Sequence, residues 1–297
     1  MAKSEIMNED DVARSAQLAM LLEVSAYPKP GNVDRTHDFV DTSYEHFLAS
    51  SVAVYPVLRD AAVRGRTKRP GVGELVRSGV EESIAWQRGG NTHFGALLLL
   101  VPLAMAAGAC VSYNPEEIKQ KATEIMVSST TDDAIEVYSV FPKAQVKVRR
   151  DVPELDVMDE ASINEISKKK LSFHEILTIS ASYDLISREL VGGFELTFKY
   201  AALIADFAKV ERINDAITHA DLQLLSEEED TFITMKSGTE KSRYVKERAM
   251  KIVNRGYERK EIEEFDDELV REGLNPGTTA DIIAAALFVS ILGGLRF

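Results

Sequence analysis

Cysteine is nearly missing from this sequence, which has one, Cys110, among its 297 residues. A single cysteine excludes a disulfide within the chain and any cysteine-rich zinc site, and it fits a reducing compartment. The N-terminal segment, "MAKSEIMNEDDVARSAQ", carries acids and has no apolar core, so it does not have the composition of a signal peptide. We therefore expect a cytoplasmic protein in which Cys110 is a small buried hydrophobic residue.

Positive charge is also scarce. Lys and Arg together number 35 against 48 Asp and Glu, which gives a formal net charge of −13. Broad nucleic-acid binding requires a positive field, so we expect no nucleic-acid partner. Any anionic ligand would have to be held by local cations, backbone amides or a metal ion.

The common phosphate-binding and catalytic signatures do not occur. The sequence contains neither G-x-x-x-x-G-K-[ST] nor G-x-G-x-x-G, which excludes the usual phosphate cradles. H-E-x-x-H, G-x-S-x-G and paired C-x-x-C motifs are missing as well. A nucleotide, if one binds, must be held in another way.

Strand-like alternation of apolar and polar residues is confined to Gln145–Arg149. Elsewhere apolar residues recur at three- and four-residue spacing, which is typical of amphipathic helices. We predict an all-α fold, a single large helical domain over residues 1–297. Residues 142–170, with mixed charge and few bulky apolar side chains, are predicted to be a loop or an insertion between two helical halves. Tyr44–Val63 is predicted as one helix, kinked at Pro56.

The segment Phe94–Tyr113, "FGALLLLVPLAMAAGACVSY", is apolar enough to raise the question of a membrane span. It runs for about twenty residues without a charge, the length that crosses a bilayer. Pro102 and small residues dilute it, and no basic cluster flanks it. Because a large core also requires a helix that is apolar all round, we expect a buried central helix and no membrane partner.

Three polar loops, each rich in Gly, Pro or Thr, precede apolar helices. Their sequences are "PKPGNVDRTHD" (Pro28–Asp38), "GGNTH" (Gly89–His93) and "NPGTTAD" (Asn275–Asp281). Free amides at a helix start attract anions, phosphate above all. Three such loops in one helical chain predict a polyanionic ligand.

The second and third loops also have a structural interpretation. Asn91 or Thr92 can cap the helix that follows, and Thr278 with Asp281 can form a capping box. Those hydrogen bonds alone would account for these residue types.

In the first loop, two prolines can simply stiffen a turn around Lys29. Asp34, His37 and Asp38 nevertheless crowd more titratable groups into the loop than a turn requires, which favours a functional site.

A fourth segment, "EEEDTFITMKSG" (Glu227–Gly238), places a carboxylate and a hydroxyl together at Asp230-Thr231. Such oxygen ligands suit Mg²⁺, although an acidic helix start explains the same pattern. Glu189, on an otherwise apolar segment, is expected to be exposed.

Taken together and in order, these segments resemble the triphosphoribosyl-dephospho-CoA synthase family. The matching residues are Glu23-Val24, Pro28 to Gly31, Val33-Asp34, His37-Asp38, Phe47 to Ser50, Asn91 to His93 with Gly95, Asp230-Thr231 and Asn275 to Asp281. They span most of the chain, and their shared order is more specific than any one of them.

The resemblance implies an all-α enzyme that breaks the adenine–ribose bond of ATP. The 5-triphosphoribosyl group passes to a hydroxyl of 3′-dephospho-CoA, and adenine is released. Departure of adenine leaves oxocarbenium character on the ribose, which a carboxylate can stabilise while another group deprotonates the acceptor hydroxyl.

The resemblance also suggests roles for individual residues. Asp34 would stabilise the ribose cation or bind metal, and His37 or His93 would transfer the proton. The residues expected to bind phosphate or ribose are Lys29, Gly31, Asn91, Thr92, Thr278 and Thr279. The expected Mg²⁺ ligands are Asp38, Asp230 and Asp281.

Two departures from the family pattern bear on the acceptor. The family's Lys after Asn-Thr-His is Phe94 here, and the segment between Asp34 and His37 is shortened. The chain looks like the divergent members from archaea and one-carbon-metabolising bacteria, and the acceptor that the resemblance implies is dephospho-CoA or a related cofactor precursor. The rival hypothesis is a non-catalytic nucleotide-binding protein of a cofactor pathway. Helix-rich surfaces also make a homo-oligomer an expectation.

Overall fold

Helices make up the regular structure of the residues that the computed structural model describes, 8–144 and 155–297, and no strand occurs among them. The all-α prediction is therefore confirmed. The strand-like segment Gln145–Arg149 lies outside the described residues.

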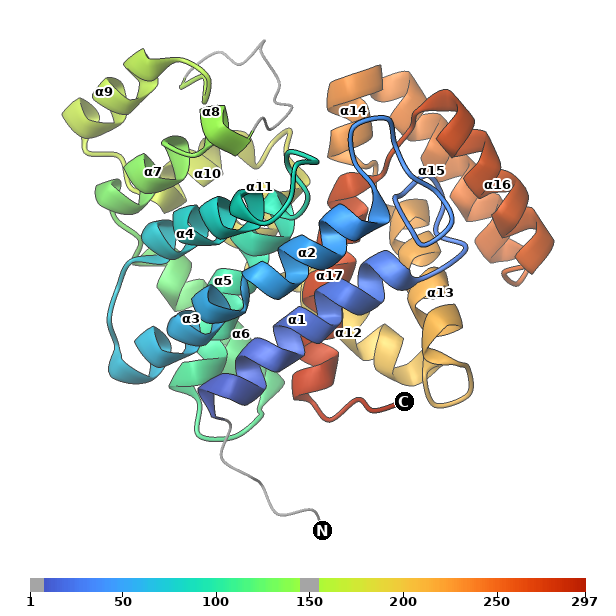
Figure 1. Ribbon diagram of the computed structural model, residues 1–297, viewed down its shortest axis with the longest axis horizontal. Coiled ribbons are helices and arrows are strands. Elements are labelled where there is room, and N and C mark those ends of the chain that lie inside the picture. The colour runs from blue at the N-terminus through green and yellow to red at the C-terminus, as the bar shows by residue number, and fades with distance from the viewer. Residues whose placement is uncertain (1–7, 145–154) are drawn as a thin grey trace.

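The helices follow one another along the chain with short connections (Figure 1). In order they are α1 (Glu9–Ser25), α2 (Tyr44–Ala53), α3 (Tyr55–Thr67), α4 (Val72–Ala85), α5 (Phe94–Ala109), α6 (Pro115–Val127), α7 (Thr131–Tyr138), α8 (Phe141–Ala144), α9 (Glu160–Lys169), α10 (Phe173–Ser180), α11 (Leu185–Val191), α12 (Glu195–Phe207), α13 (Ile213–Glu227), α14 (Thr231–Ser237), α15 (Thr239–Asn254), α16 (Arg259–Glu272) and α17 (Gly277–Leu292).

Two helices that are apolar on nearly every side, α5 and α17, form the centre of the core. They pack against each other, α5 also packs on α3, and α17 packs on α1 and α12. The predicted buried central helix is confirmed, and Cys110 at its end is buried. Among the described residues, no helix combines the length and the hydrophobicity needed to cross a membrane.

Glycine allows α3 and α5 to approach each other closely. A Cβ atom added at Gly65 would lie 1.8 Å from the carbonyl oxygen of Met105, and one added at Gly108 would lie 2.0 Å from that of Ala62. Larger residues would push the two helices apart. Small residues lower the hydrophobicity of Phe94–Tyr113 relative to a membrane span, and Gly108 among them allows close helix packing.

Two predictions about helix boundaries need correction. The expected kinked helix Tyr44–Val63 is two helices, because Pro56 lies in the first turn of α3 and the chain breaks at Val54. Residues 142–170, predicted as a loop or an insertion, are not a loop throughout, because Glu160–Lys169 form α9 behind an Asp159 cap.

A second, smaller hydrophobic cluster joins α13, α15 and α16. It contains Leu222, Val245 and Phe265, and it is separate from the main core around α5 and α17. The long loop between α1 and α2 lies against this group, since the N–H of Gly31 in the loop donates to Asp266 of α16 and a Cβ atom added at Gly31 would lie 2.8 Å from Cβ of Leu269. This packing fixes the loop that carries Lys29, Asp34 and His37.

Candidate active site

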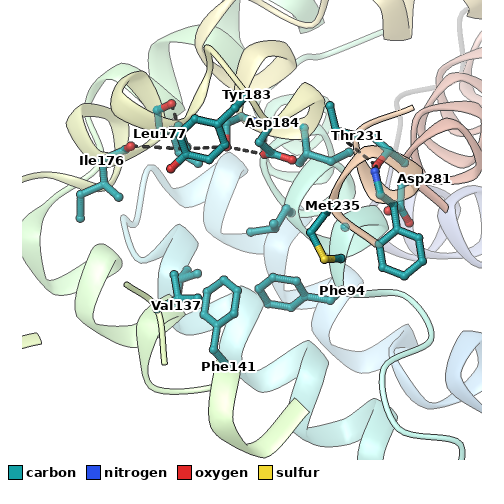
Figure 2. A pocket seen from close by; sticks show the side chains of 18 of the residues that line it. Phe94, Val137, Phe141, Ile176, Leu177, Tyr183, Asp184, Thr231, Met235 and Asp281 are labelled. Carbon is teal, nitrogen blue, oxygen red and sulfur yellow. Dashed lines mark hydrogen bonds between the residues drawn. The ribbon is translucent and has the colours of Figure 1, made fainter. Parts of the chain in front are cut away.

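A pocket of about 720 Å³ opens where several helices begin. Its wall comes from α5, α7, α8, α10, α11, α14, α15 and α17 with the loops beside them (Figure 2). This volume is typical of a small-molecule site. Three of the predicted binding residues, Asn91, Thr278 and Asp281, line it.

Three long helices, α5, α15 and α17, direct their N-terminal ends at this pocket. Each is 16 residues long, and first-turn residues of each line the wall, namely Gly95, Thr239 and Thr278. The amide groups and the positive end of the helix dipole make such ends favourable for anions. Of the three polar loops predicted to receive an anion, the second and third therefore contribute to the pocket, whereas none of Pro28–Asp38 lines its wall.

One side of the pocket is aromatic. The ring centroids of Phe94 and Phe141 are 4.8 Å apart in an edge-to-face arrangement, and Tyr138 lies 6.0 Å from Phe141. Figure 2 shows the rings of Phe94 and Phe141 beside each other, with Met235 between them and Asp281. Phe94, which departs from the family pattern, therefore forms part of an apolar surface.

The polar side of the pocket centres on Asp281. A Cβ atom added at Gly95 would lie 2.0 Å from Oδ2 of Asp281, so this carboxylate sits directly on the first turn of α5. The backbone N–H of Ala96 donates to it. Burial raises the pKa of Asp281 well above its ordinary value, and the nearby carboxylates of Glu23 and Asp230 raise it further.

The capping-box interpretation of Thr278 and Asp281 is wrong, because neither side chain caps α17. Asp281 reaches the start of α5 instead, and the hydroxyl of Thr278 accepts from the N–H of Phe232 in α14 at 3.2 Å. These side chains tie three helix starts together. The N-cap of α5 is His93 and not Asn91 or Thr92, although Oδ1 of Asn91 accepts from the N–H of Phe94, the first residue of the helix, at 3.0 Å.

Asp230 holds the starts of α14 and α17 together. Its Oδ1 accepts from the N–H groups of Phe232 (2.9 Å) and Ile233 (3.0 Å), and its Oδ2 accepts from the N–H (2.8 Å) and hydroxyl (2.9 Å) of Thr279. Burial raises the pKa of Asp230 to about 6 in spite of these donors. Four hydrogen bonds leave this carboxylate little capacity for a metal, and Thr279 is committed to it.

Lys29 lies in the interior and not in the pocket wall. It is 1% exposed and is ion-paired with the Glu23 carboxylate. Burial raises the pKa of Glu23, and the Lys29 charge opposes that rise. The sequence predicts Lys29 as a phosphate ligand, whereas in the structure the Lys29 ammonium group neutralises the carboxylate of Glu23 in α1.

His93 and Thr92 take part in a chain of hydroxyl groups beneath the start of α5. Nδ1 of His93 lies 2.8 Å from the Ser50 hydroxyl, and the Ser50 hydroxyl lies 2.7 Å from that of Ser83. The Ser83 hydroxyl in turn lies 3.2 Å from that of Thr92. Burial, followed by the nearby Lys29 charge, lowers the pKa of His93 to about 3. The ring is neutral, and its buried Nε2 has no hydrogen-bond partner among the described residues.

The loop residues Gly31, Asp34 and His37 come together with an acid that the sequence predictions omit, Asp266 of α16. The N–H of Gly31 donates to Oδ1 of Asp266 at 2.9 Å, and Nδ1 of His37 lies 3.1 Å from Oδ2. Gly31 has φ +74° and an added Cβ would lie 2.3 Å from the Leu274 carbonyl, so only glycine fits there. Burial raises the pKa of Asp266 to about 6.

The three predicted Mg²⁺ ligands do not form a common cluster in the described part of the chain. Asp38 is exposed and its Oδ1 accepts from the N–H of Tyr44 at the start of α2. Asp230 is engaged by four donors, and Asp281 lines the pocket. Asp34 and His37 are not part of the pocket wall either.

Two buried acids, Asp221 and Asp266, were missed because their helices look like ordinary amphipathic surface helices. A signal was present: Asp266 is four residues after Ile262 and three before Leu269, and Asp221 is four residues after Ile217. Helical geometry places residues at these spacings on one face. Both acids thus lie on apolar stripes, and both are fully buried.

Comparisons of this chain with known proteins point to one family of enzymes. The family model described as ATP:dephospho-CoA triphosphoribosyl transferase (CitG) matches residues 9–296. A Streptococcus equi subsp. equi protein named "Probable 2-(5''-triphosphoribosyl)-3'-dephosphocoenzyme-A synthase" is 28% identical, and the alignment covers 95% of this chain and 97% of that protein. The Klebsiella pneumoniae 2-(5''-triphosphoribosyl)-3'-dephosphocoenzyme-A synthase is 25% identical, with 96% and 91% covered.

A solved structure shows the same fold. The crystal structure of a candidate triphosphoribosyl-dephospho-coA synthase from Archaeoglobus fulgidus matches with a TM-score of 0.68 and 28% identity, covering 84% of this chain and all of that one. The helical fold and the matches define an all-α transferase. The chain belongs to the ATP:dephospho-CoA triphosphoribosyl transferase family.

Proposed function

We propose that this protein transfers the 5-triphosphoribosyl group of ATP to a hydroxyl of 3′-dephospho-CoA or a related cofactor precursor and releases adenine. The match of the family model over residues 9–296 carries this proposal. The relatives are named as synthases, and nothing in the comparisons favours the rival hypothesis of a non-catalytic nucleotide-binding protein.

The two sides of the pocket suit the two ends of ATP. The aromatic side, with Phe94, Phe141 and Tyr138, offers rings against which adenine can stack. The helix starts at Gly95, Thr239 and Thr278 offer amides for the triphosphate. In this arrangement the ribose lies between the rings and Asp281.

The carboxylate of Asp281 is the group that we place nearest the reacting ribose. The C1′–adenine bond breaks, a bond from C1′ to the acceptor oxygen forms, and the hydroxyl proton ends on adenine. A carboxylate stabilises the positive charge that develops on the ribose, and that charge in turn favours the ionised form of Asp281 against the burial that raises its pKa. His93 is neutral with a pKa of about 3, which suits a hydrogen-bonding role better than proton transfer.

Mg²⁺ is part of the proposal because of the charges around the pocket. Asp184 and Asp281 line it, and no Lys, Arg or His does so within the described part of the chain. Mg²⁺ typically binds one or two carboxylates together with substrate phosphates, and Asp281 fits this role, whereas Asp184 is held as the cap of α11 by the N–H and hydroxyl of Ser187. When bound, the ion would neutralise part of the triphosphate charge. Of the ligands predicted from sequence, Asp281 alone keeps this role.

The test is to incubate the purified protein with ATP, Mg²⁺ and dephospho-CoA and to measure free adenine by chromatography and the adduct by mass spectrometry. We expect one adenine for each adduct. Adenine without adduct would point to another acceptor, and no adenine under either condition would refute the transferase proposal. A cytoplasmic location and self-association remain predictions from the sequence.

A further inference from the structure

The loop between α1 and α2 meets α16 at three side chains that can act as metal ligands. Asp34 and His37 come from the loop and Asp266 comes from the helix, and one ligand atom of each lies within 4.8 Å of the others. Figure 1 shows this loop beside α15 and α16. The cluster is separate from the pocket, whose wall includes none of the three residues.

Each aspartate in the cluster has one oxygen fixed by the protein and one oxygen free. Oδ1 of Asp34 accepts from the N–H (2.7 Å) and hydroxyl (2.6 Å) of Thr36 and from the N–H of His37 (3.0 Å). Oδ1 of Asp266 accepts from the N–H of Gly31 at 2.9 Å. Both Oδ2 atoms are buried and accept no hydrogen bond from the part of the chain that the structure describes.

Two free, buried carboxylate oxygens are unfavourable unless something pairs with them, because a buried polar atom without a partner loses its hydration. Both aspartates have 0% of their surface exposed. His37 lies over them, with Nδ1 3.1 Å from Oδ2 of Asp266 and 3.9 Å from Oδ1 of Asp34. These contacts are ion pairs when the imidazole is protonated, whereas a neutral imidazole leaves Oδ2 of Asp266 without a hydrogen bond among the described residues.

We propose that Asp34, His37 and Asp266 bind a divalent transition-metal ion through one carboxylate oxygen of each aspartate and an imidazole nitrogen. A mixed set of two carboxylates and one imidazole suits Mn²⁺, Fe²⁺ or Zn²⁺, whereas Mg²⁺ prefers oxygen ligands alone. The backbone donors to each Oδ1 orient the carboxylates, as outer-shell partners do in metal sites. The partly exposed His37 provides the route from solvent.

The site would have a structural consequence, since it joins a loop to a helix more than two hundred residues later. Gly31 already connects the two through its hydrogen bond to Asp266. A bound ion would hold the loop, and with it Lys29, against α16. This role is independent of triphosphoribosyl transfer and would persist if the proposed reaction failed its test.

The experiment is a titration of chelator-treated protein with MnCl₂, followed by electron paramagnetic resonance of the free ion, with thermal melting alongside. We expect one saturable Mn²⁺ per chain and a higher melting temperature with the ion. Asp34→Asn, His37→Gln and Asp266→Asn should each weaken binding at least tenfold. Glu264→Gln, an exposed acid on the same helix, should bind as the wild type does.

Two further measurements separate this site from others. Asp281→Asn should keep the Mn²⁺ site, because Asp281 belongs to the pocket. MgCl₂ should displace Mn²⁺ only in large excess. If Asp266→Asn fails to fold, His37→Gln decides, because that side chain is partly exposed. No saturable Mn²⁺, binding retained in His37→Gln, or equal competition by Mg²⁺ would each overturn the proposal.

Discussion

The ammonium group of Lys29 and the carboxylate of Glu23 form an ion pair in the interior, where the two residues are 1% and 3% exposed. The lysine comes from the loop that precedes α2 and the glutamate from the last turns of α1. In sequence, a lysine between two prolines looks like a phosphate ligand. In the structure it neutralises an acid that burial would otherwise leave unpaired.

Replacing Lys29 should therefore cost stability. We expect Lys29→Met to lower the free energy of unfolding by about 3–5 kcal/mol, because it leaves the buried Glu23 carboxylate without a partner. Denaturant unfolding at neutral pH measures the loss. The double variant Lys29→Met/Glu23→Gln should recover most of it. A Lys29→Met protein as stable as the wild type would show that the lysine serves a ligand and not the fold.

Asp221 should make stability depend on pH. Burial raises its pKa to about 8 from a usual value of 3.8; Lys29 opposes the rise, and Glu23, Asp230 and Asp266 reinforce it. Between about pH 4 and 8 the folded state therefore keeps a proton that the unfolded state releases, so stability falls as pH rises. Each pH unit in this window costs up to about 1.4 kcal/mol.

The variant Asp221→Asn isolates this effect, because it keeps the shape and removes the charge. Its stability relative to the wild type should grow steadily from pH 5 to pH 8 in denaturant unfolding. If the free energies of unfolding of the two proteins differed by the same amount at every pH in this range, the raised pKa of Asp221 would be contradicted.

The aromatic side of the pocket should determine ATP affinity. We expect Phe141→Ala to raise the dissociation constant for ATP by roughly 5- to 150-fold, because the loss of one stacked ring costs about 1–3 kcal/mol. Calorimetric titration with ATP measures this. Phe297→Ala, an exposed phenylalanine at the C-terminus, is the control. Weaker dephospho-CoA binding with unchanged ATP binding would assign this side to the acceptor instead.

Gly95 should be required for the position of Asp281. In Gly95→Ala the new Cβ would lie 2.0 Å from Oδ2 of Asp281 and must displace it. We expect turnover to fall at least tenfold with little change in secondary structure, since alanine favours a helix. Gly79→Ala, where the neighbour is the tip of the Leu97 side chain, should stay near wild-type turnover. Equal turnover in both variants would argue against a role for this carboxylate.

Local signals were enough to predict the helices and several of their ends. α6 begins at Pro115 because Asn114 caps it, Pro115 fills its first position and two acids follow. Long-range hydrogen bonds were not predictable in this way. Asp281 has the residue type and spacing of a cap for its own helix, yet it accepts from Ala96 at the start of α5. Which helix start lies nearest is decided by tertiary packing.

Glu189 shows the same limit. Expected on the surface, it is buried because its carboxylate accepts from the N–H groups of Leu196 and Thr197 and from the Thr197 hydroxyl, which satisfies the start of α12. An acid on an apolar helix can be buried when N–H or hydroxyl groups of neighbouring segments donate hydrogen bonds to its carboxylate, and otherwise it is exposed. Sequence periodicity identifies the face of the helix but not the donors.

Adenine release by wild-type and Asp281→Asn protein, measured with ATP, Mg²⁺ and dephospho-CoA, is the most direct test of the proposed active site. Asn keeps the shape of the side chain but cannot carry its charge, so the fold should persist. The proposal predicts acceptor-dependent adenine release by the wild type and a loss of at least a hundredfold in the variant, about 2.7 kcal/mol of transition-state stabilisation. Equal rates for the two proteins would contradict it.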